Sequence, residues 1–508
     1  MGISNWVTHA YAFALWQVLI IVVLSGAIFA QIGHPTFEDS SNICDKCSCI
    51  KANKTSNVLS YDLLDCARRN LQNMLAEWPE HFDTADPERE IVFSLSGNAI
   101  VRLEQLPGTK SAVVFSCRHC LLEVLAGGLF LETPKILRVD LSWNRLSGDS
   151  LHADVFRGQF DGESITPLPL DELDLGHNNI TYLARDTFKH ITGLRQLTLS
   201  HNPISELAGV TGQAIAMLVH LEMLDLSYQG LTAIDEHVFA EMDALHELKV
   251  QGNQFLQIPE AIFRTTSLIT LQIGENPFVE FSIEKPLPHL RHLDVSSMPW
   301  LGRIEVDSFK NANNLRTLIC RNTTSLDKFD MQIFQHASEL QELDLSNSNL
   351  KHLILPPDAV DRTGTLRYAK NLETLLLEGN SWHCDCELQG VLNLFAYDQL
   401  SDTDEDARCE MPYLLTSLHI SELSYIDVCD VPLNEDQKGF TYEKPAFLRP
   451  RAIFLSLLSV GIVLGLGVII GLLVVCLKRR LNNNGLGFTS PVRYTSVRDS
   501  TLSTTYKV

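Results

Sequence analysis

Leucine and related apolar residues recur at fixed places along most of this chain. The pattern Leu-x-x-Leu-x-Leu-x-x-Asn-x-Leu occurs twelve times between Ile91 and Cys384, with most copies 22 to 27 residues apart. A period of this length predicts an array of similar units, each with one short strand. The ninth positions are Asn98, Cys120, Asn144, Asn178, Asn202, Gln229, Asn253, Asn276, Met298, Thr323, Ser348 and Asn380.

Each unit alone is too small to bury its apolar side. Positions one, four and six of the pattern point inward and are covered only by the neighbouring units. The amide at position nine can satisfy backbone groups in the bend after each strand, which predicts a ladder of such residues inside the coil. A phenylalanine lies five or six residues ahead of many copies and is expected to stack on the convex side: Phe130, Phe188, Phe239, Phe263, Phe309 and Phe334.

Complete copies such as Leu194 to Ile204 and Leu245 to Phe255 resemble the extracellular leucine-rich repeat superfamily. The resemblance covers roughly residues 44–429. It implies an α/β fold, a horseshoe-shaped leucine-rich repeat solenoid with a parallel concave sheet and a disulfide-bonded cap at each end. With the apolar segments described next, the whole chain is similar to single-pass transmembrane adhesion and recognition receptors.

Two long apolar segments flank the repeats. Residues 1–30 end in small residues before Gln31 and predict a cleaved signal peptide, with an uncleaved anchor as the alternative because no Lys or Arg precedes the segment. Residues 452–477 are 26 uncharged residues, about 39 Å as a helix, which is enough to span a bilayer of about 30 Å. Lys478, Arg479 and Arg480 follow. The positive-inside rule therefore predicts a type I plasma-membrane protein with an extracellular amino terminus.

Four cysteines lie on each side of the repeats. They predict an amino-terminal cap and lead-in at 31–90 and a carboxyl-terminal cap at 384–429, on either side of repeats at 91–383 and before a linker at 430–451. Four cysteines allow three pairings, and the residues alone leave these open. The resemblance implies the pairs Cys44 with Cys49, Cys47 with Cys66, Cys384 with Cys409, and Cys386 with Cys429.

Three further cysteines fall inside the repeats. Cys117 and Cys320 occupy position six of their copies, and Cys120 occupies position nine. A small apolar thiol packs well at such inward positions. We therefore expect buried thiols here, and neither a metal site nor a cofactor.

Three Asn-x-Ser/Thr sequons lie between the two apolar segments, at Asn53, Asn179 and Asn322. Asn179 is at position ten and Asn322 at position eight of their copies, and both positions face solvent. The sequence therefore predicts glycosylation at all three.

The candidate binding residues lie on the concave sheet. Position eight of copies two to six carries His119, Trp143, His177, His201 and Tyr228, and position five carries Asp140, Asp174 and Asp225. Exposed aromatic side chains supply much of the binding energy at protein interfaces, so this stripe predicts a protein-binding surface anchored by Trp143 and Tyr228. The acidic row is equally well explained as a means of keeping the sheet soluble.

Charge narrows the classes of partner. The chain has a net charge of −22, divided into +5 in the tail 478–508 and −27 in the rest. An acidic ectodomain disfavours nucleic acid and heparin as partners. No phosphate-binding glycine loop, His-Glu-x-x-His or Gly-x-Ser-x-Gly motif occurs, so we expect a protein that is not an enzyme.

The tail and the spanning segment suggest further contacts. Tyr506, Lys507 and Val508 fit the strand-addition mode of a PDZ adaptor. The short tail is expected to signal through such recruited partners. Two Gly-x-x-x-Gly motifs within 452–477 could support a homodimer in the membrane, although glycine is frequent in such helices.

The leading hypothesis is a cell-surface protein that recognises another extracellular protein or mediates adhesion through its concave face. The alternative is a receptor or coreceptor for a secreted ligand, in innate immunity or growth-factor signalling, that acts through a partner chain. Clustering of expressing cells would favour adhesion, and binding to a secreted factor would favour the alternative. Both hypotheses rest on family analogy.

Overall fold

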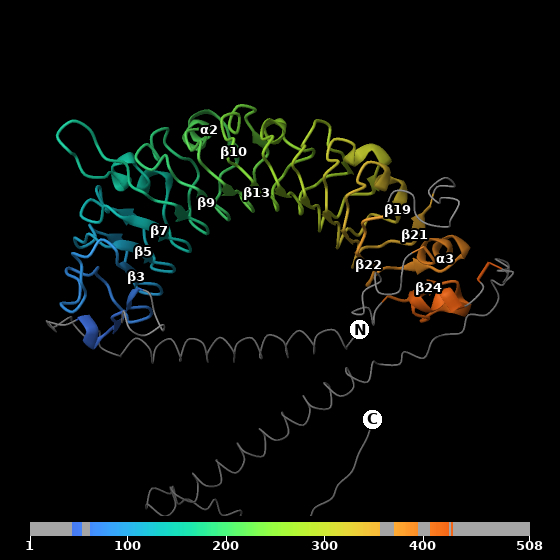
Figure 1. Ribbon diagram of the computed structural model, residues 1–508, viewed down its shortest axis with the longest axis horizontal. Coiled ribbons are helices and arrows are strands. Elements are labelled where there is room, and N and C mark those ends of the chain that lie inside the picture. Colours follow the sequence, from blue (N-terminus) through green and yellow to red (C-terminus); the bar gives the residue numbers. More distant parts are fainter. Residues whose placement is uncertain (1–42, 53–60, 356–369, 395–406, 426–427, 430–508) are drawn as a thin grey trace, which may run out of the picture. The chain divides into compact units, whose positions relative to one another are not determined.

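The computed structural model describes residues 43–52, 61–355, 370–394, 407–425 and 428–429. These residues lie in one compact unit, Met1–Pro432. Within it the repeats form a curved array whose inner face is a single sheet (Figure 1). The predicted solenoid with a parallel concave sheet is confirmed.

The inner sheet has 14 strands in the described part of the chain. The first pair, β1 and β2, is antiparallel, and every later pair is parallel. In order across the sheet the strands are β1 Ser48–Ile50, β2 Asp62–Asp65, β3 Glu90–Ser94, β5 Ala112–Ser116, β7 Ile136–Asp140, β8 Glu172–Asp174, β9 Gln196–Thr198, β11 Met223–Asp225, β13 Glu247–Lys249, β14 Thr270–Gln272, β16 His292–Asp294, β18 Thr317–Ile319, β20 Glu342–Asp344 and β22 Thr374–Leu376.

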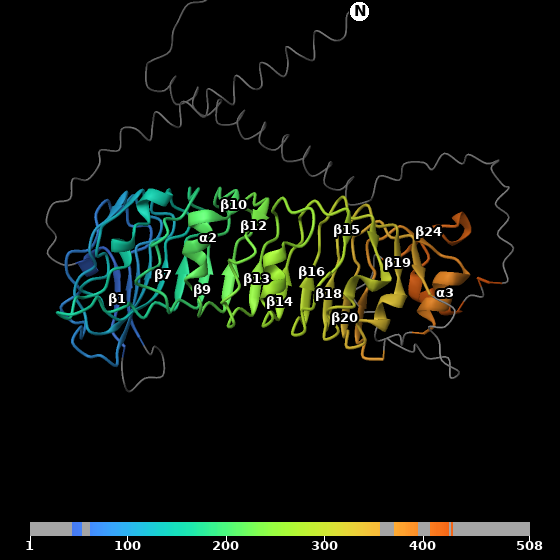
Figure 2. The same ribbon diagram turned by 90° about the horizontal axis from the view of Figure 1, so that it is seen from above.

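The outer side of each coil is built from short strands and helices, several of which Figure 2 shows from above. The short strands pair with their counterparts in neighbouring coils: β4 Arg102–Leu103 with β6 Val124–Leu125, β10 Glu206–Leu207 with β12 Ala233–Ile234, β15 Glu280–Phe281 with β17 Arg303–Ile304, and β19 Lys328–Asp330 with β21 His352–Ile354. The helices are α2 Gly209–Ala216 and the 3₁₀ turns η2 Gly148–Ser150, η3 Ala153–Phe156, η4 Glu260–Arg264, η5 Val306–Phe309 and η6 Met331–Gln335.

The core runs along the whole array as one cluster of buried apolar residues. The six phenylalanines predicted to stack between coils are all buried, and the ring centroid of Phe130 lies 6.3 Å from that of Phe156 in the next coil. Free Cys320 is also buried, as expected.

Position nine carries the predicted amide ladder. Asn253 accepts hydrogen bonds at Oδ1 from the backbone N–H groups of Gln229 (3.2 Å) and Leu231 (3.0 Å) in the preceding coil. Its Nδ2 donates to the carbonyls of Leu226 and Val250, each at 2.9 Å. One buried side chain thus satisfies backbone groups of two coils, which a buried turn requires.

Both ends of the array are closed by disulfides. At the amino end, beside η1 Ile43–Asp45, the structure pairs Cys44 with Cys49 and Cys47 with Cys66. At the carboxyl end it pairs Cys384 with Cys409 and Cys386 with Cys429. These are the pairs that the resemblance implies. The carboxyl-terminal cap contains β23 Trp382–His383, β24 Cys409–Met411, α3 Cys386–Leu392, η7 Tyr413–Leu415 and η8 Ile420–Tyr425.

One prediction about the cysteines is wrong. Cys117 and Cys120, expected to be separate buried thiols, form a disulfide. The turn after β5 brings positions six and nine of one copy face to face, so the two sulfur atoms meet. Both residues remain fully buried.

Among the described residues, no helix is both long enough and apolar enough to cross a membrane. The predicted signal peptide at 1–30, the linker at 430–451, the spanning segment at 452–477 and the tail with Tyr506, Lys507 and Val508 lie outside the described residues.

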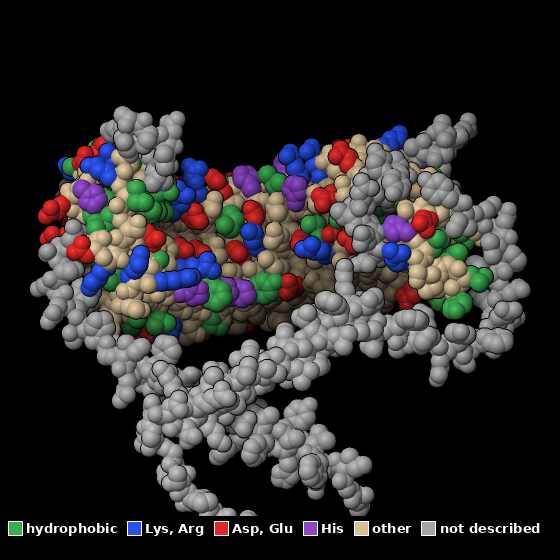
Figure 3. Space-filling model, turned by 90° about the horizontal axis from the view of Figure 1, so that it is seen from below, with side chains coloured by type: hydrophobic (Ala, Val, Ile, Leu, Met, Phe, Trp, Pro, Cys, Tyr) green, Lys and Arg blue, Asp and Glu red, His purple; other side chains and the backbone are tan. Residues whose placement is uncertain are grey.

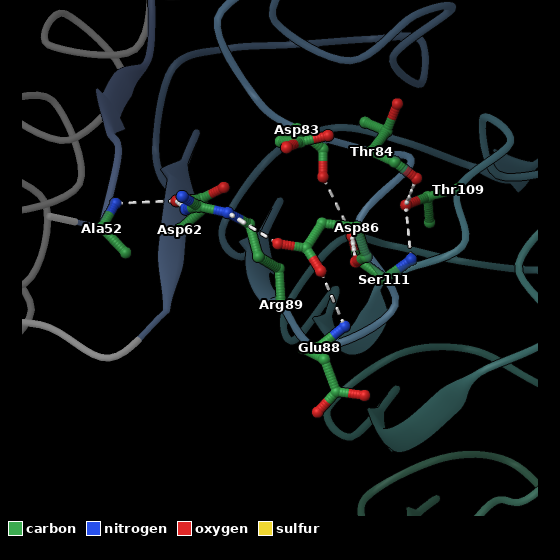
Figure 4. Close-up of polar contacts among 9 residues, drawn as sticks. All are labelled: Ala52, Asp62, Asp83, Thr84, Asp86, Glu88, Arg89, Thr109 and Ser111. Carbon is green, nitrogen blue, oxygen red and sulfur yellow. Dashed lines mark hydrogen bonds and ion pairs between the residues drawn. The ribbon is translucent and has the colours of Figure 1, made fainter. Parts of the chain in front are cut away.

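The amino-terminal cap is joined to the lead-in loop by a buried ion pair (Figure 4). Asp62 of β2 is fully buried, and its Oδ1 lies 2.9 Å from Arg89 Nη1 while also accepting from the N–H of Ala52. Ser111 donates to the carbonyl of Asp86 (2.8 Å) and thus holds the loop against the start of β5. The long lead-in is therefore fixed at several points.

Arg89→Met is expected to lower the free energy of unfolding by about 3–5 kcal/mol, because it leaves the Asp62 carboxylate buried without its charge partner. Urea denaturation measures this change. The control is Arg102→Met, whose partner Glu104 is exposed and whose loss should cost less than about 1 kcal/mol. Equal effects of the two substitutions would contradict the buried pairing.

Gln229→Asn is expected to stabilise the protein by about 1 kcal/mol. Gln229 takes the place of a ladder asparagine, and its Nε2 donates to the carbonyl of Leu199, but its buried Oε1 has no hydrogen-bond partner. Asparagine would place the oxygen where the other copies use it. The reciprocal change Asn253→Gln should destabilise in the same urea assay, and a less stable Gln229→Asn protein would refute this account.

Candidate functional site

The position-eight residues lie in a left-handed turn directly after each strand. His119, Trp143, His177, His201 and Tyr228 have φ angles between 54° and 58°. The same conformation occurs at this position in other copies, where small or polar residues such as Gly252 and Asn322 occupy it. Left-handed backbone disfavours bulky side chains. Trp143 and Tyr228 therefore run against the local backbone preference, whereas histidine is enriched in this region.

The five rings form a continuous aromatic ladder along the sheet, in which His119 is tilted against Trp143 and the other four rings are stacked. The centroid of Trp143 lies 4.8 Å from that of His119 and 3.7 Å from that of His177. His201 continues the stack at 4.0 Å from His177 and 4.5 Å from Tyr228. Neighbouring parallel strands are about 4.8 Å apart, so one ring per coil is held near stacking distance.

The ladder is exposed along one face of the array. Trp143 is 41% and Tyr228 36% exposed, and His119 and His201 are exposed as well. In Figure 3 a row of His (purple) and hydrophobic (green) side chains crosses this face and ends at acidic side chains (red). The position-eight residues from His119 to Tyr228 therefore lie side by side in one row.

Two residues that the sequence did not single out contact the aromatic ladder, one at its second ring and one at its last. The Arg118 guanidinium carbon lies 5.8 Å from the centre of the Trp143 ring, within the range of a cation–π interaction. At the last ring, the Tyr228 hydroxyl donates to Glu275 Oε1 at 2.6 Å. Glu275 is at position eight, two copies further along. Because Glu275 shares position eight with the aromatic residues, the repeat pattern could have identified it as part of the same row.

Glycine at position 252 makes room for this last contact. A Cβ at Gly252 would lie 2.3 Å from the Tyr228 ring, so the ring passes over the glycine to reach Glu275. Partial burial, and then the hydrogen bond to Glu275, raise the pKa of Tyr228 to about 12. The hydroxyl therefore remains a donor throughout the physiological pH range.

Cys117 and Cys120 enclose the start of the ladder. Their disulfide closes the turn that carries Arg118 and His119. Cys120 still takes part in the amide ladder, because its N–H donates to Asn144 Oδ1 at 2.9 Å. The disulfide thus fixes the turn that presents the first ring of the stack.

The acidic row has a structural role in addition to its charge. Asp140, Asp174 and Asp225 are half-buried, and Oδ1 of each accepts from the N–H two residues later. These bonds stabilise the turn that ends each strand. One carboxylate oxygen of each residue is therefore used within the fold.

Burial and mutual repulsion change the titration of this surface. Burial is the largest cause that raises the pKa of Asp174 to about 6, and Asp140 and Asp225 add to it. Burial, followed by the nearby positive charges of His201 and Arg118, lowers the pKa of His177. His177 is accordingly neutral at pH 7 and stacks as an uncharged ring.

The predicted glycosylation residues are accessible where the structure describes them. Asn179 and Asn322 are exposed, and Asn322 Nδ2 donates to Ser297 Oγ at 3.0 Å. Asn53 lies outside the described residues.

Comparison with known proteins agrees with this architecture. Residues 166–204 match the leucine rich repeat model, and residues 291–354 match the BspA type leucine rich repeat region. The chain is a leucine-rich repeat protein.

Similar proteins are cell-surface or extracellular leucine-rich repeat proteins. Trophoblast glycoprotein of Macaca fascicularis is 24% identical over 331 residues, 61% of this chain and 62% of that protein. Human Toll-like receptor 9 is 28% identical over 297 residues, 50% of this chain and 25% of the receptor. Human lumican is 26% identical over 258 residues, 47% of this chain and 67% of lumican. The chain thus spans about three fifths and one quarter of the first two relatives.

Among solved structures, a chain in the octameric complex of latrophilin 3, Unc5D and FLRT2 matches this leucine-rich repeat protein with a TM-score of 0.44 and 18% identity. The match covers 73% of this chain and 95% of that one.

Asp174→Asn is expected to raise the free energy of unfolding at pH 7.4. The raised pKa means that the folded state resists ionisation of Asp174, whereas the Asn oxygen can still accept from Gly176. The gain should be on the order of 1 kcal/mol, since one pKa unit is worth about 1.4 kcal/mol and solvent screens a half-buried group.

This gain should shrink as the pH falls from about 6 towards 3.8, because wild-type Asp174 then becomes protonated in the folded state first. Thermal denaturation across this range measures it. Asp243→Asn at an exposed site is the control. A gain independent of pH would refute the assignment.

Proposed function

We propose that this leucine-rich repeat protein is a single-pass type I protein of the plasma membrane that recognises another extracellular protein, or mediates adhesion, through its concave face. The stacked aromatic ladder from His119 to Tyr228 is the observation that supports the proposal most strongly. Its rings pack on one another and are at least partly exposed, and Trp143 and Tyr228 occupy a left-handed turn that disfavours bulky side chains. Locally unfavourable residues that persist in a well-defined arrangement point to a functional surface.

The aromatic ladder is suited to protein recognition because it is already ordered. Interfaces draw much of their energy from a few Trp, Tyr and Arg side chains in a rigid setting. Trp143, Arg118 and Tyr228 have these chemistries, and each is held by a neighbour through stacking, a cation–π contact or a hydrogen bond. The half-buried acidic row adds negative charge beside them, which favours a partner with basic groups.

The membrane anchorage and the tail functions rest on the sequence. The apolar residues 452–477 and the basic residues after them support the orientation, and Asn53, Asn179 and Asn322 would carry glycans on the extracellular side. The cell-surface and extracellular relatives agree with this location. The end Tyr506, Lys507 and Val508 supports recruitment of an adaptor by the tail, and the Gly-x-x-x-Gly motifs within 452–477 support a homodimer through the spanning segment. A binding role without catalysis fits a sequence that has none of the catalytic motifs named above.

A binding screen tests the proposal. Residues 31–451 are produced as a secreted, multimerised probe, and its binding is measured on cells that each display one extracellular protein, including this one. Trp143→Ala and Tyr228→Ala are each expected to weaken binding by at least tenfold, because aromatic anchors that a partner covers contribute on the order of 2 kcal/mol to the binding free energy. Trp300→Ala is the matched control, since Trp300 is 66% exposed and lies outside the aromatic ladder.

Binding to itself or to another membrane protein would support recognition or adhesion, and binding only to a secreted factor would support the receptor or coreceptor alternative. Binding that survives both ladder substitutions and is lost in Trp300→Ala would refute the concave face as the binding surface.

A further inference from the structure

Two histidines and an aspartate converge at the carboxyl-terminal cap, well away in sequence from the aromatic ladder. His352 lies in β21, His383 in β23, and Asp385 directly before α3. One potential ligand atom from each lies within 4.8 Å of the others. The sequence predicts no metal site, and residue spacing does not reveal this group because His352 is 31 residues from His383 in the chain.

The backbone around the group is tightly fixed. Cys384, between His383 and Asp385, is bonded to Cys409, and Cys386 is bonded to Cys429. The N–H of His383 donates to the carbonyl of Lys351 at 3.0 Å, which joins the cap to the residue before His352. Two separate segments therefore present their side chains to one place without a change of fold.

Asp385 has one oxygen available for a ligand. Its Oδ1 accepts from the N–H of Leu388 at 2.9 Å and caps α3. Its Oδ2 lies 3.7 Å from Nδ1 of His352, and the ring centroids of His352 and His383 are 5.2 Å apart. The helix cap thus orients the carboxylate and leaves the second oxygen towards the imidazole.

This donor set selects a class of ion. Two imidazole nitrogens and one carboxylate suit Zn²⁺ and neighbouring transition metals, whereas Ca²⁺ and Mg²⁺ prefer oxygen ligands only. Bonds of about 2.0–2.2 Å require ligand atoms within about 4 Å of each other. The three potential ligand atoms lie within 4.8 Å of one another, and all three residues are half-buried, so a metal ion would have to draw the side chains closer together.

We propose that His352, His383 and Asp385 bind one divalent transition-metal ion, Zn²⁺ above all, on the carboxyl-terminal cap. Three protein ligands leave a further coordination position for water or for a group from a partner. The site depends on neither the aromatic ladder nor its proposed ligand. It would add a cross-link between β21 and the cap beside the two disulfides.

Calorimetry tests this proposal. The full-length chain is purified in detergent, stripped of metal with a chelator and titrated with ZnCl₂. One Zn²⁺ per chain is expected to bind with an affinity that falls at least tenfold in His383→Gln and in His352→Ala. Asp385→Asn should also weaken binding, while asparagine retains the helix cap. His336→Ala is the matched control, because His336 pairs with Asp307 and belongs to no three-ligand group among the described residues.

Thermal denaturation with and without Zn²⁺ provides the second measurement. Bound metal should raise the Tm of the wild-type chain and of His336→Ala, but not that of His383→Gln. Equal Zn²⁺ affinity in the wild-type and in the ligand variants would overturn the proposal. So would a wild-type chain that binds no Zn²⁺, which would leave His352 and Asp385 as a side-chain contact only.

Discussion

The buried amide at position nine is the interaction on which the array depends. Every coil must turn sharply after its inner strand, and the turn buries backbone N–H and carbonyl groups that water cannot reach. Asn202 shows the solution: its oxygen accepts from Ile180 of one coil, and its nitrogen donates to the carbonyls of Leu175 and Leu199. Because each amide bridges two coils, the repeats are coupled in hydrogen bonding as well as in their apolar contacts.

The turn that the amide stabilises also determines the binding surface. It requires a left-handed residue just before the amide, and that residue has its side chain outside the core. The main sheet repeats this position at every coil. The spacing between neighbouring strands, about 4.8 Å, is close to the distance between stacked rings. A constraint of the fold therefore supplies a regular row of outward positions, and the rings from His119 to Tyr228 use it to form one continuous surface.

The ends of the array require other means, because an end coil has a neighbour on one side only. At the amino end, disulfides and the buried pair of Asp62 and Arg89 hold the first strands and the lead-in loop. At the carboxyl end, Cys384 and Cys386 connect the cap to itself within the short segment that also holds His383 and Asp385. Disulfides and ion pairs stabilise the end coils, whereas the middle coils are stabilised by a neighbouring repeat on each side.

The sequence by itself determined the solenoid, the inward Leu positions, the asparagine ladder and the row of His119, Trp143, His177, His201 and Tyr228, because a short period places equivalent residues at equivalent points. Tertiary structure decided what that period does not encode. Cys117 and Cys120 bond because the turn brings their side chains together, Tyr228 reaches Glu275 across two coils, and His352 meets His383 and Asp385 through the packing of β21 against the cap. Each of these contacts depends on side-chain direction and on distances across the coils, and neither is expressed in residue spacing.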